Sequence, residues 1–478
     1  MTGKDSFLQS LSEATALIKK HANTGEAVRI LTHSDADGIA AGGIMGQALR
    51  RLGMPFKVSC EKRLDEELMK SVASESPHLV IFTDMGSGYL DIIEHYLSGT
   101  EKLVVDHHYP IDISPSNMVH INPMNHGLDG SREISGAGLA YLLARTLDPN
   151  NFDLSILGIV GALADQQDKG EKKTLFGLNA EIEAEAKKAE LLKTFVDLIF
   201  FGYETRPLAK AIARTTSPFI PGLSGREDRA VAFLQEISIE LKNQGRWRTL
   251  KDLSEQEKQN LFSELSKHLL SQGCGPELVH ELIGTIYLFP KEEARTPLRD
   301  GREFASLLNA CARMDRPSLG ISICLGDRDK GFEEAERLFD DYRRKIAEYL
   351  EWVNLTGPIE ERRNIYILKA GREIDDRIIG VVASILLSAG ILKNKKPIIA
   401  VAKSDEGLVK ISARADEDMA SSGIDLGKAV MEAAEKASGR GGGHDTAAGA
   451  FLKEEENEKF LTAVDSIVGN QLRSKKSH

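Results

Sequence analysis

Aspartate and histidine side chains follow three short apolar segments near the start of this chain, and one more aspartate follows an apolar helical pattern. They are His33, Asp35 and Asp37 after ILT, Asp84 after LVIFT, Asp106, His107 and His108 after LVV, and Asp165 after LGIVGALA. In an open parallel sheet the carboxyl ends of the strands meet at one edge, where ligands bind. We therefore expect these side chains to gather at one site.

Carboxylates gathered in this way repel one another and raise one another's pKa unless a cation offsets their charge. A mixed Asp and His set without cysteine suits Mn²⁺, Fe²⁺, Zn²⁺ or Mg²⁺, and Mn²⁺ is the best match. The number of ligands allows two ions, an arrangement that stabilises the attacking and leaving oxygens in phosphoryl hydrolysis. A single aspartate after a strand is most often a helix cap or a turn former, so the prediction depends on three such strand ends. Asp168 is either a residue that contacts the metal ligands from outside or a solvated loop residue, and the sequence does not favour one over the other. His126 is interpreted as a loop residue and not as a metal ligand.

The segments that must position these side chains alternate between strand and helix patterns. We expect strands at Ala27–Leu31, Phe56–Ser59, Leu79–Phe82, Lys102–Val105 and Met118–Ile121. Helical patterns cover Gly38–Leu52, Asp65–Ala73, Leu90–Leu97, Gly136–Leu147 and Leu154–Ala164. This alternation predicts an α/β fold with a mostly parallel sheet covered on both faces.

Beyond this region the pattern changes to polar and helical. Residues from about 225 to 296 interrupt the rhythm and are interpreted as a helical insert. Glu303–Met314 predicts a helix, Gly320–Leu325 a strand, and residues 331–354 a long amphipathic connector helix. After Gly357 the strand and helix alternation returns. We therefore predict a first domain at 1–330 carrying the insert, the connector at 331–354, and a smaller α/β domain at 355–478.

A second group of polar residues lies near the carboxyl end of the chain. Arg414 ends the run ISAR, and a glycine-rich run comprises Arg440, Gly441, Gly442, Gly443 and His444. A glycine backbone has no side chains, so a phosphate can approach it closely, and its N–H groups can form an anion-binding nest. An arginine guanidinium can bind two oxygens of one phosphate at once. A local basic stretch precedes this run and comprises Lys393, Lys395, Lys396, Lys403, Lys410 and Arg414.

Composition limits the classes of function. The 478 residues carry a formal net charge of −11, so the overall field does not attract nucleic acid and any such role needs a local basic surface. Four cysteines without CxxC spacing exclude a zinc ribbon and fit a reducing compartment. The start of the chain has no signal-peptide pattern and no apolar run is long enough to span a membrane, so we expect a cytoplasmic protein.

The order HSDADG, Asp84, DHH and Asp165, followed by SAR and GRGGGH, resembles the DHH phosphoesterase superfamily with its DHH-associated C-terminal domain. Within it the chain is most similar to archaeal RecJ-like exonucleases of the GINS-associated type. The resemblance implies a metal cleft between the two domains and an activated water as the nucleophile. It also implies a GINS-binding surface on the insert, although a purely structural excursion is the alternative.

The resemblance further assigns roles to single residues. Those implied as metal ligands are His33, Asp35, Asp37, Asp84, His107 and Asp165, with Asp84 bridging two Mn²⁺ ions that Mg²⁺ or Co²⁺ could replace. His108 is implied to contact the scissile phosphate, and Asp106 to orient a metal-ligating histidine through a hydrogen bond. Residues implied to bind substrate phosphate are Arg414, Arg440, Gly441, Gly442, Gly443 and His444.

The function expected is a metal-dependent exonuclease on single-stranded DNA or RNA that releases mononucleotides, in DNA replication or repair. Aromatic residues are only 6% of the chain, so backbone electrostatics should dominate over base stacking. Two alternatives stay open. One is a phosphodiesterase for short oligonucleotides or cyclic dinucleotides, and the other is a GINS-binding replisome scaffold. Polarity and the choice between DNA and RNA are not determined by the sequence.

Overall fold

The computed structural model describes residues 3–215, 218–389, 392, 394–404 and 407–475. It divides into two compact units, each made of two stretches of chain. The first unit combines residues 1–205 with 283–340, and the second combines 206–282 with 341–478. Among the described residues, no helix combines the length and the apolar character needed to span a bilayer.

The first unit is built around a five-stranded sheet in which all neighbours run parallel. Its strands are β1 (Val28–His33), β2 (Phe56–Glu61), β3 (Leu79–Thr83), β4 (Glu101–Val105) and β5 (Met118–Ile121). They lie in the order β2-β1-β3-β4-β5, which confirms the predicted parallel sheet. The chain order reverses between β1 and β3, and such a switch point is where open α/β sheets bind ligands.

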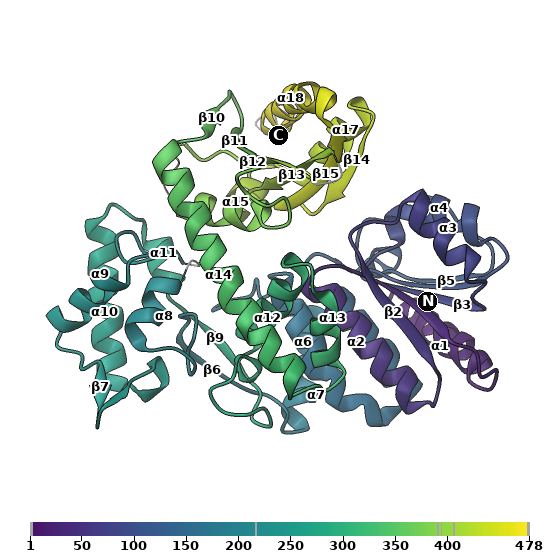
Figure 1. Cartoon of the computed structure of the whole chain (residues 1–478), viewed down its shortest axis with the longest axis horizontal. Helices are drawn as coiled ribbons and strands as arrows, with labels where there is room; N and C mark the ends of the chain where they lie inside the picture. The colour runs from purple at the N-terminus through teal and green to yellow at the C-terminus, as the bar shows by residue number, and fades with distance from the viewer. Residues whose placement is uncertain (1–2, 216–217, 390–391, 393, 405–406, 476–478) are drawn as a thin grey trace. The chain divides into compact units, whose positions relative to one another are not determined.

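Helices cover both faces of this sheet (Figure 1). They are α1 (Gly3–His21), α2 (Ala36–Arg51), α3 (Glu66–Ser74), α4 (Leu90–Leu97), α5 (Gly136–Leu147) and α6 (Ser155–Ala164). On the face under α3 and α4, buried Phe82 and Val104 pack with Met69 and Ile93. The apolar residues of β3 are buried along its whole length, as expected for a strand covered on both sides.

The remainder of the first unit packs beside α2 and α6. It comprises α7 (Gly177–Lys188), β6 (Lys193–Leu198), β9 (Ile283–Leu288), α12 (Gly301–Arg313), α13 (Pro317–Cys324) and the start of α14 (Lys330–Thr356). Helix α13 lies so close to α2 that a Cβ added at Gly43 would be 2.3 Å from the Cβ of Cys324. Glycine at this position therefore sets the distance between the two helices.

The structure corrects two sequence predictions here and adds one helix that was not predicted. Gly320–Leu325 was predicted as a strand, but it forms the end of helix α13 with Leu325 as the C-cap, and this helix begins with Pro317 at a position that suits proline. The region predicted as mainly helical contains β9, which pairs antiparallel with β6. Helix α1 was not predicted at all. Short apolar runs such as Gly320–Leu325 do not distinguish a buried strand from a buried helix by periodicity alone.

The second unit contains a helical segment and an α/β segment. The helical segment holds α8 (Leu208–Arg214), α9 (Glu227–Glu236), α10 (Glu255–Ser271), α11 (Pro276–His280) and a short hairpin of β7 (Lys242–Asn243) and β8 (Arg246–Trp247). Helix α10 begins with a capping box in which Ser254 and Glu257 satisfy each other's backbone N–H groups. The predicted long helix is present as α14, most of which belongs to this unit.

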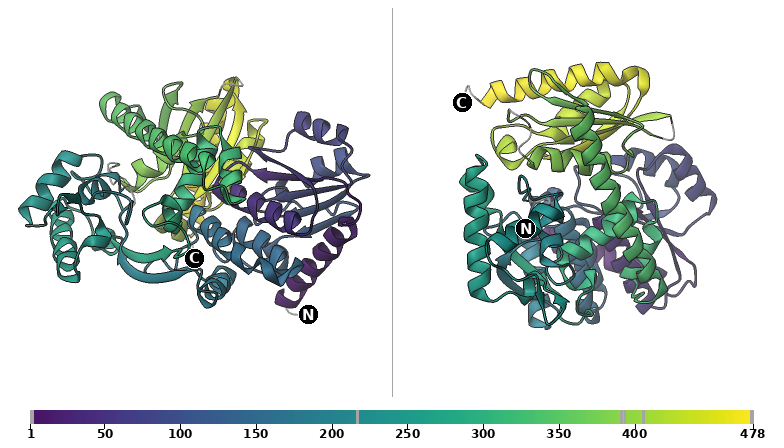
Figure 2. Two further views of the ribbon diagram at one scale, coloured as in Figure 1. Left: turned by 60° about the horizontal axis from the view of Figure 1, so that its bottom comes forward. Right: turned by 60° about the vertical axis from the view of Figure 1, so that its left-hand side comes forward.

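The α/β segment has a six-stranded mixed sheet in the order β10-β11-β12-β13-β15-β14. Its strands are β10 (Ile359–Glu361), β11 (Tyr366–Gly371), β12 (Ile398–Lys403), β13 (Leu408–Arg414), β14 (Arg440–Gly443) and β15 (Ala447–Lys453). The helices are α15 (Ile379–Ser388), α16 (Glu417–Ser421), α17 (Leu426–Lys436) and α18 (Asn457–Lys475). Helices α17 and α18 cover one face, and α15 lies on the other (Figures 1 and 2).

Candidate metal centre

The predicted residues of the first unit come together where three neighbouring strands end. His33 is the last residue of β1, Asp84 directly follows β3, and the run beginning at Asp106 directly follows β4. Because β1, β3 and β4 are adjacent and parallel, their carboxyl ends deliver these side chains to one edge. Asp165 reaches the same place from the end of α6, where it is the C-cap residue.

Asp35 and His33 form one side of the site. Asp35 is the N-cap of α2, and its Oδ1 accepts a hydrogen bond from the Gly38 N–H at 3.0 Å. Its other oxygen lies 2.9 Å from Nδ1 of His33. A Cβ at Gly38 would be 2.2 Å from the carbonyl oxygen of His33, so this tight turn requires glycine.

Asp84 lies between this pair and a second group. Its backbone is left-handed, with φ of 57°, and its side chain is almost completely buried. Neither carboxylate oxygen accepts a hydrogen bond from any described residue. Instead Oδ2 lies 3.4 Å from Nδ1 of His33, and Oδ1 lies 3.1 Å from Nε2 of His107. Two buried acceptors without a hydrogen bond are costly, and a cation on each side would satisfy them.

The second group consists of Asp37, His107 and Asp165. Nε2 of His107 lies 3.8 Å from Asp37 and 3.3 Å from Asp165. The other ring nitrogen of His107 is 2.7 Å from the carbonyl oxygen of Gly130, so Nδ1 carries the proton and donates it there. This bond leaves Nε2 as the ring nitrogen directed at the carboxylates, where it could bind a metal, and such a pairing is usual for a metal-ligating histidine.

The N-terminus of helix α5 holds Asp37 in place. The Asp37 carboxylate accepts hydrogen bonds from the N–H groups of Gly136 at 2.7 Å and Ala137 at 3.0 Å. A helix N-terminus favours negative charge, so α5 stabilises this buried carboxylate. Glycine also makes room for it, since a Cβ at Gly161 of α6 would lie 2.1 Å from Asp37 Oδ1.

The pKa values show that the metal-free site has too much negative charge for its burial. Burial, with the nearby charge of Asp84, raises the pKa of Asp37 to about 7. Burial and the charge of Asp37 raise the pKa of Asp165 well above its usual value. Burial alone would lower the pKa of His33 and of His107, because it disfavours a charged imidazole. The nearby carboxylates outweigh this effect: Asp35 raises the pKa of His33, and Asp84 and Asp165 raise the pKa of His107. Divalent cations would remove these shifts by replacing the protons.

The donor atoms form two neighbouring sets that fit a pair of ions. His33, Asp35 and Asp84 offer atoms all within 4.8 Å of one another, and so do Asp37, His107 and Asp165. Imidazole and carboxylate donors without thiolate suit Mn²⁺, Zn²⁺ or Fe²⁺. Asp84 faces both sets, one with each oxygen. The donor set therefore fits the group that the sequence implied.

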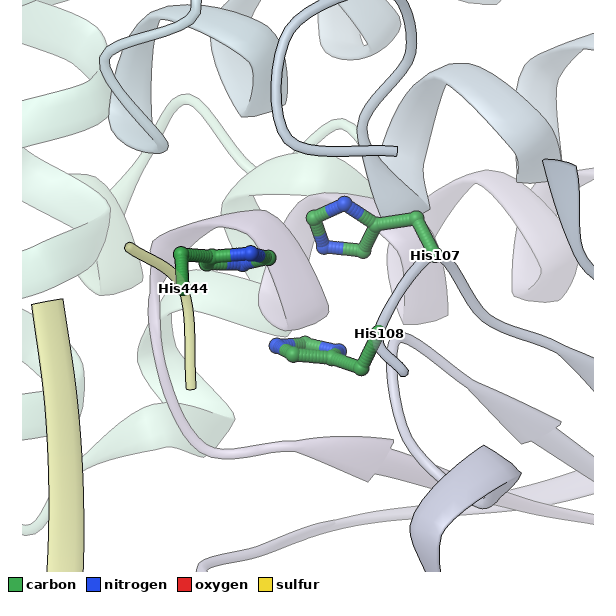
Figure 3. A group of neighbouring side chains, drawn as sticks. All are labelled: His107, His108 and His444. Carbon is green, nitrogen blue, oxygen red and sulfur yellow. The ribbon is translucent and has the colours of Figure 1, made fainter. Parts of the chain in front are cut away.

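His108 lies beside the second set but is held differently (Figure 3). Its ring centroid is 4.5 Å from that of His107. Its Nδ1 is 2.8 Å from Oδ1 of Asp106, which also accepts the His108 backbone N–H at 3.1 Å. Although burial opposes it, His108 lowers the pKa of Asp106, so this carboxylate stays ionised. Asp106 thus fixes the ring of His108, whereas the expectation from the sequence was that it orients a metal-ligating histidine.

A buried polar chain behind His108 was not found from the sequence. Asn122 Nδ2 donates to the His108 carbonyl oxygen at 2.8 Å and to Ser87 Oγ at 2.9 Å. The Ser87 N–H donates to Asp106 at 2.8 Å, and its hydroxyl is 2.9 Å from Nε2 of His120. Burial lowers the pKa of His120, which favours the neutral ring, and its Nε2 can then accept a hydrogen bond from the Ser87 hydroxyl. The only sequence signal for this chain was Asn122-Pro123 directly after β5.

The second unit holds the predicted phosphate-binding residues, including His444, which Figure 3 also draws. Arg414 ends β13, and its Nε donates to Ser384 Oγ at 3.0 Å. The run Arg440–Gly443 is not a loop but β14, an edge strand paired with β15. Successive N–H groups of an extended strand point to opposite sides, so the predicted nest is wrong for this run.

The predicted basic stretch is largely neutralised. Lys395 lies 2.7 Å from Asp418, Lys396 lies 2.6 Å from Glu361, and Lys403 lies 2.6 Å from Glu454. Lys393 lies outside the described residues. The acidic partners are distant in sequence, which is why the stretch looked more basic than it is. Lys410 and Arg414 lie on β13.

Three family models match this chain. Residues 27–162 match the DHH family N-terminal domain, 200–283 the DHH-CID domain and 364–470 the DHHA1 domain. An uncharacterized protein of Methanocaldococcus jannaschii is 32% identical over 474 residues, covering 98% of this chain and 99% of its own. The chain therefore belongs to the DHH family. The domain bounds predicted at 1–330, 331–354 and 355–478, with the insert at about 225–296, remain predictions.

The chain also has weak sequence similarity to RecJ proteins and shares a fold with RecJ and CDC45 structures. The single-stranded-DNA-specific exonuclease RecJ of Dickeya dadantii is 24% identical over 153 residues, which cover 30% of this chain and 27% of that protein. The structure of Thermus thermophilus RecJ with Mn²⁺ matches with a TM-score of 0.58 at 19% identity, covering 96% of this chain and 55% of that one. CDC45 of Entamoeba histolytica matches with a TM-score of 0.64 at 12% identity, covering 98% and 99%. These structural matches show a shared fold.

Proposed function

We propose that this chain is a metal-dependent phosphodiesterase that degrades single-stranded DNA or RNA from an end and releases mononucleotides. The observation that carries the proposal is Asp84, whose two buried oxygens face two separate sets of imidazole and carboxylate donors. In this proposal the ions are two Mn²⁺, which Mg²⁺ or Co²⁺ could replace. The RecJ relative, described as specific for single-stranded DNA, supports the choice of substrate.

Each set of residues has a defined part in this proposal. His33, Asp35 and Asp84 would hold one ion, and Asp37, His107, Asp165 and again Asp84 would hold the other. When bound, the ions supply positive charge for the phosphate and lower the pKa of the attacking water. His108 donates Nδ1–H to Asp106, and in this proposal its Nε2 is the atom that contacts a phosphate or leaving oxygen.

The second unit supplies phosphate contacts in the same proposal. Arg414 is fixed from Ser384, and a Cβ at Gly380 would lie 2.6 Å from its guanidinium, so α15 makes room for this side chain. Arg440 is exposed on the edge strand β14. A guanidinium group can bind two oxygens of one phosphate at once. The nucleic acid backbone would approach closely at Gly441, Gly442, Gly443 and His444.

The test is digestion of single strands labelled at either end, as DNA and as RNA, with Mn²⁺, Mg²⁺ or Co²⁺. Wild-type protein should release labelled mononucleotide from one end, and Asp84→Asn should abolish release. Asn tolerates the left-handed backbone at this position, so this variant keeps the local fold. Asp112→Asn, at an exposed loop aspartate, is the matched control and should stay active.

Other results would favour the alternatives. Activity that falls as the strand lengthens indicates a phosphodiesterase of short oligonucleotides or cyclic dinucleotides. No cleavage by pure wild-type protein with any of the three ions refutes the nuclease and leaves a replisome scaffold.

The helical segment of the second unit supports an additional proposal of partner binding. Trp247 and Leu270 are 49% and 54% exposed, and exposed aromatic and apolar side chains are frequent at protein interfaces. We propose that this segment binds a GINS-type replication partner, in a role in replication or repair. Trp247→Ala should weaken binding to purified GINS, and unchanged binding by this variant and by Leu270→Ala would refute it.

A further inference from the structure

Three strands of the second unit place an aromatic side chain between two basic ones. In the antiparallel register, Phe451 of β15 is opposite Lys410 of β13 on one side and Arg440 of β14 on the other. Directly paired residues of neighbouring strands project from the same face of a sheet. Lys410, Phe451 and Arg440 therefore form one row across this face.

This face is not the one that forms the core. Along β15, Ala448, Ala450 and Leu452 are buried in the cluster with α17 and α18, while the alternate residues, including Phe451, stay partly exposed. A strand with one solvated face normally carries polar residues there. A phenylalanine on that face is thus not explained by the packing of the core.

The row next to it is flat. On this face Gly449 and Gly442 are opposite each other in the register. A Cβ at Gly442 would meet nothing within 4 Å, and one at Gly449 would first meet Nζ of Lys410 at 3.2 Å. Glycine in a strand weakens it and often marks a place where another molecule approaches closely.

The charges are arranged around the ring. Nζ of Lys410 lies 4.2 Å from the centroid of Phe451, a cation–π distance, and Arg440 on the edge strand is exposed. Proteins that bind single strands combine aromatic side chains, on which bases stack, with cations that follow the backbone. The row of Lys410, Phe451 and Arg440 has both the aromatic ring and the cations, and it lies beside the glycine backbone of Gly442 and Gly449.

We propose that Phe451 is a stacking platform for one nucleobase of a single strand, and that Lys410 and Arg440 bind the phosphates on either side of it. The proposal rests on the proposed function for its substrate class. It adds a base contact to a binding mode that composition had predicted to be mainly electrostatic. Because every base has an aromatic face, such a platform reads the presence of a base and not its identity.

The experiment compares two single strands of equal length and charge, one with normal bases and one with abasic sites. Fluorescence anisotropy of labelled strands gives the dissociation constants of the full chain, in EDTA so that no cleavage occurs. Wild-type protein should prefer the base-bearing strand by about tenfold, the scale of one stacked base. Phe451→Leu should lose that preference and Phe451→Trp should keep it.

Matched controls separate stacking from charge and from folding. Phe195→Leu makes the same change at another partly exposed phenylalanine and should keep the wild-type preference. Lys410→Ala and Arg440→Ala should weaken binding of both strands equally and each reduce the salt dependence by about one phosphate contact. Retained preference in Phe451→Leu, or no preference in the wild type, refutes the platform. The proposed nuclease is judged separately by metal-dependent cleavage, so a protein that cleaves yet ignores Phe451 refutes only this inference.

Discussion

Gly161 on α6 provides the sharpest test of how closely the fold surrounds the candidate metal centre. A Cβ at this position would lie 2.1 Å from Asp37 Oδ1 and 2.4 Å from the Cβ of Ala137, so alanine forces α6 and Asp37 apart. Overpacking of this kind costs about 1–3 kcal/mol, against which helix propensity gains about 1 kcal/mol. Moving Asp37 also weakens its two hydrogen bonds from α5, each worth about 1.5–3 kcal/mol because the acceptor is charged. We expect Gly161→Ala to lower the free energy of unfolding by about 2–4 kcal/mol.

The same helix contains a matched control. A Cβ at Gly158 would come no closer than 3.3 Å, to the Cβ of Tyr141, so Gly158→Ala should change stability by less than about 1 kcal/mol. Urea unfolding measures both variants, and titration with Mn²⁺ measures the metal affinity of the folded proteins. Gly161→Ala should bind Mn²⁺ at least about tenfold more weakly, as expected when a ligand is displaced. Equal stability and equal Mn²⁺ affinity of the two variants would refute the reasoning.

Three further predictions concern protons, orientation and phosphate binding. In metal-free protein the raised pKa of Asp37 means that the folded state holds a proton more tightly than the unfolded state, so the free energy of unfolding falls as pH rises from about 4 to about 7. Asp37→Asn should flatten this decline, measured as melting temperature against pH. An unchanged slope of melting temperature against pH contradicts the raised pKa of Asp37. Asn122→Ala removes the hydrogen bonds from Asn122 to the His108 carbonyl oxygen and to Ser87 Oγ, and should reduce kcat about tenfold or more while KM for an oligonucleotide stays constant. A change confined to KM argues against a positioning role. Arg414→Lys loses the planar fork and should raise KM several-fold with little change in melting temperature; an unaltered KM would show that this arginine does not touch the substrate.

The positions of the candidate metal-site residues were predictable because they depend on simple geometry. Short apolar runs alternating with helices imply parallel strands, and parallel strands bring their ends together. His33, Asp84 and His107 needed no further information. The left-handed backbone of Asp84 and the exclusion of hydrogen-bond donors from its oxygens depend on packing, and only the structure shows them.

Other features had no local signal. The run RGGG has no apolar alternation, and only pairing with β15 makes it a strand. Asn122 and Ser87 are single polar residues 35 positions apart whose hydrogen bond depends on the order of the strands. The charge of the lysine stretch was misjudged because carboxylates distant in sequence neutralise it.

The contact between α2 and α13 has a consequence for biosynthesis. Cys324 of α13 packs against Gly43 of α2, and Gln47 Nε2 donates a hydrogen bond to the Cys324 carbonyl oxygen. Cys324 lies 277 residues after Gln47 in the chain. While the ribosome makes the intervening residues, the glycine-lined side of α2 has no cover, although the five strands beside it are already complete. The last helices of the first unit thus emerge after the whole helical segment 206–282. A nascent chain stalled within that segment should be open to proteases and chaperones at α2, and should become resistant only once α13 has left the exit tunnel.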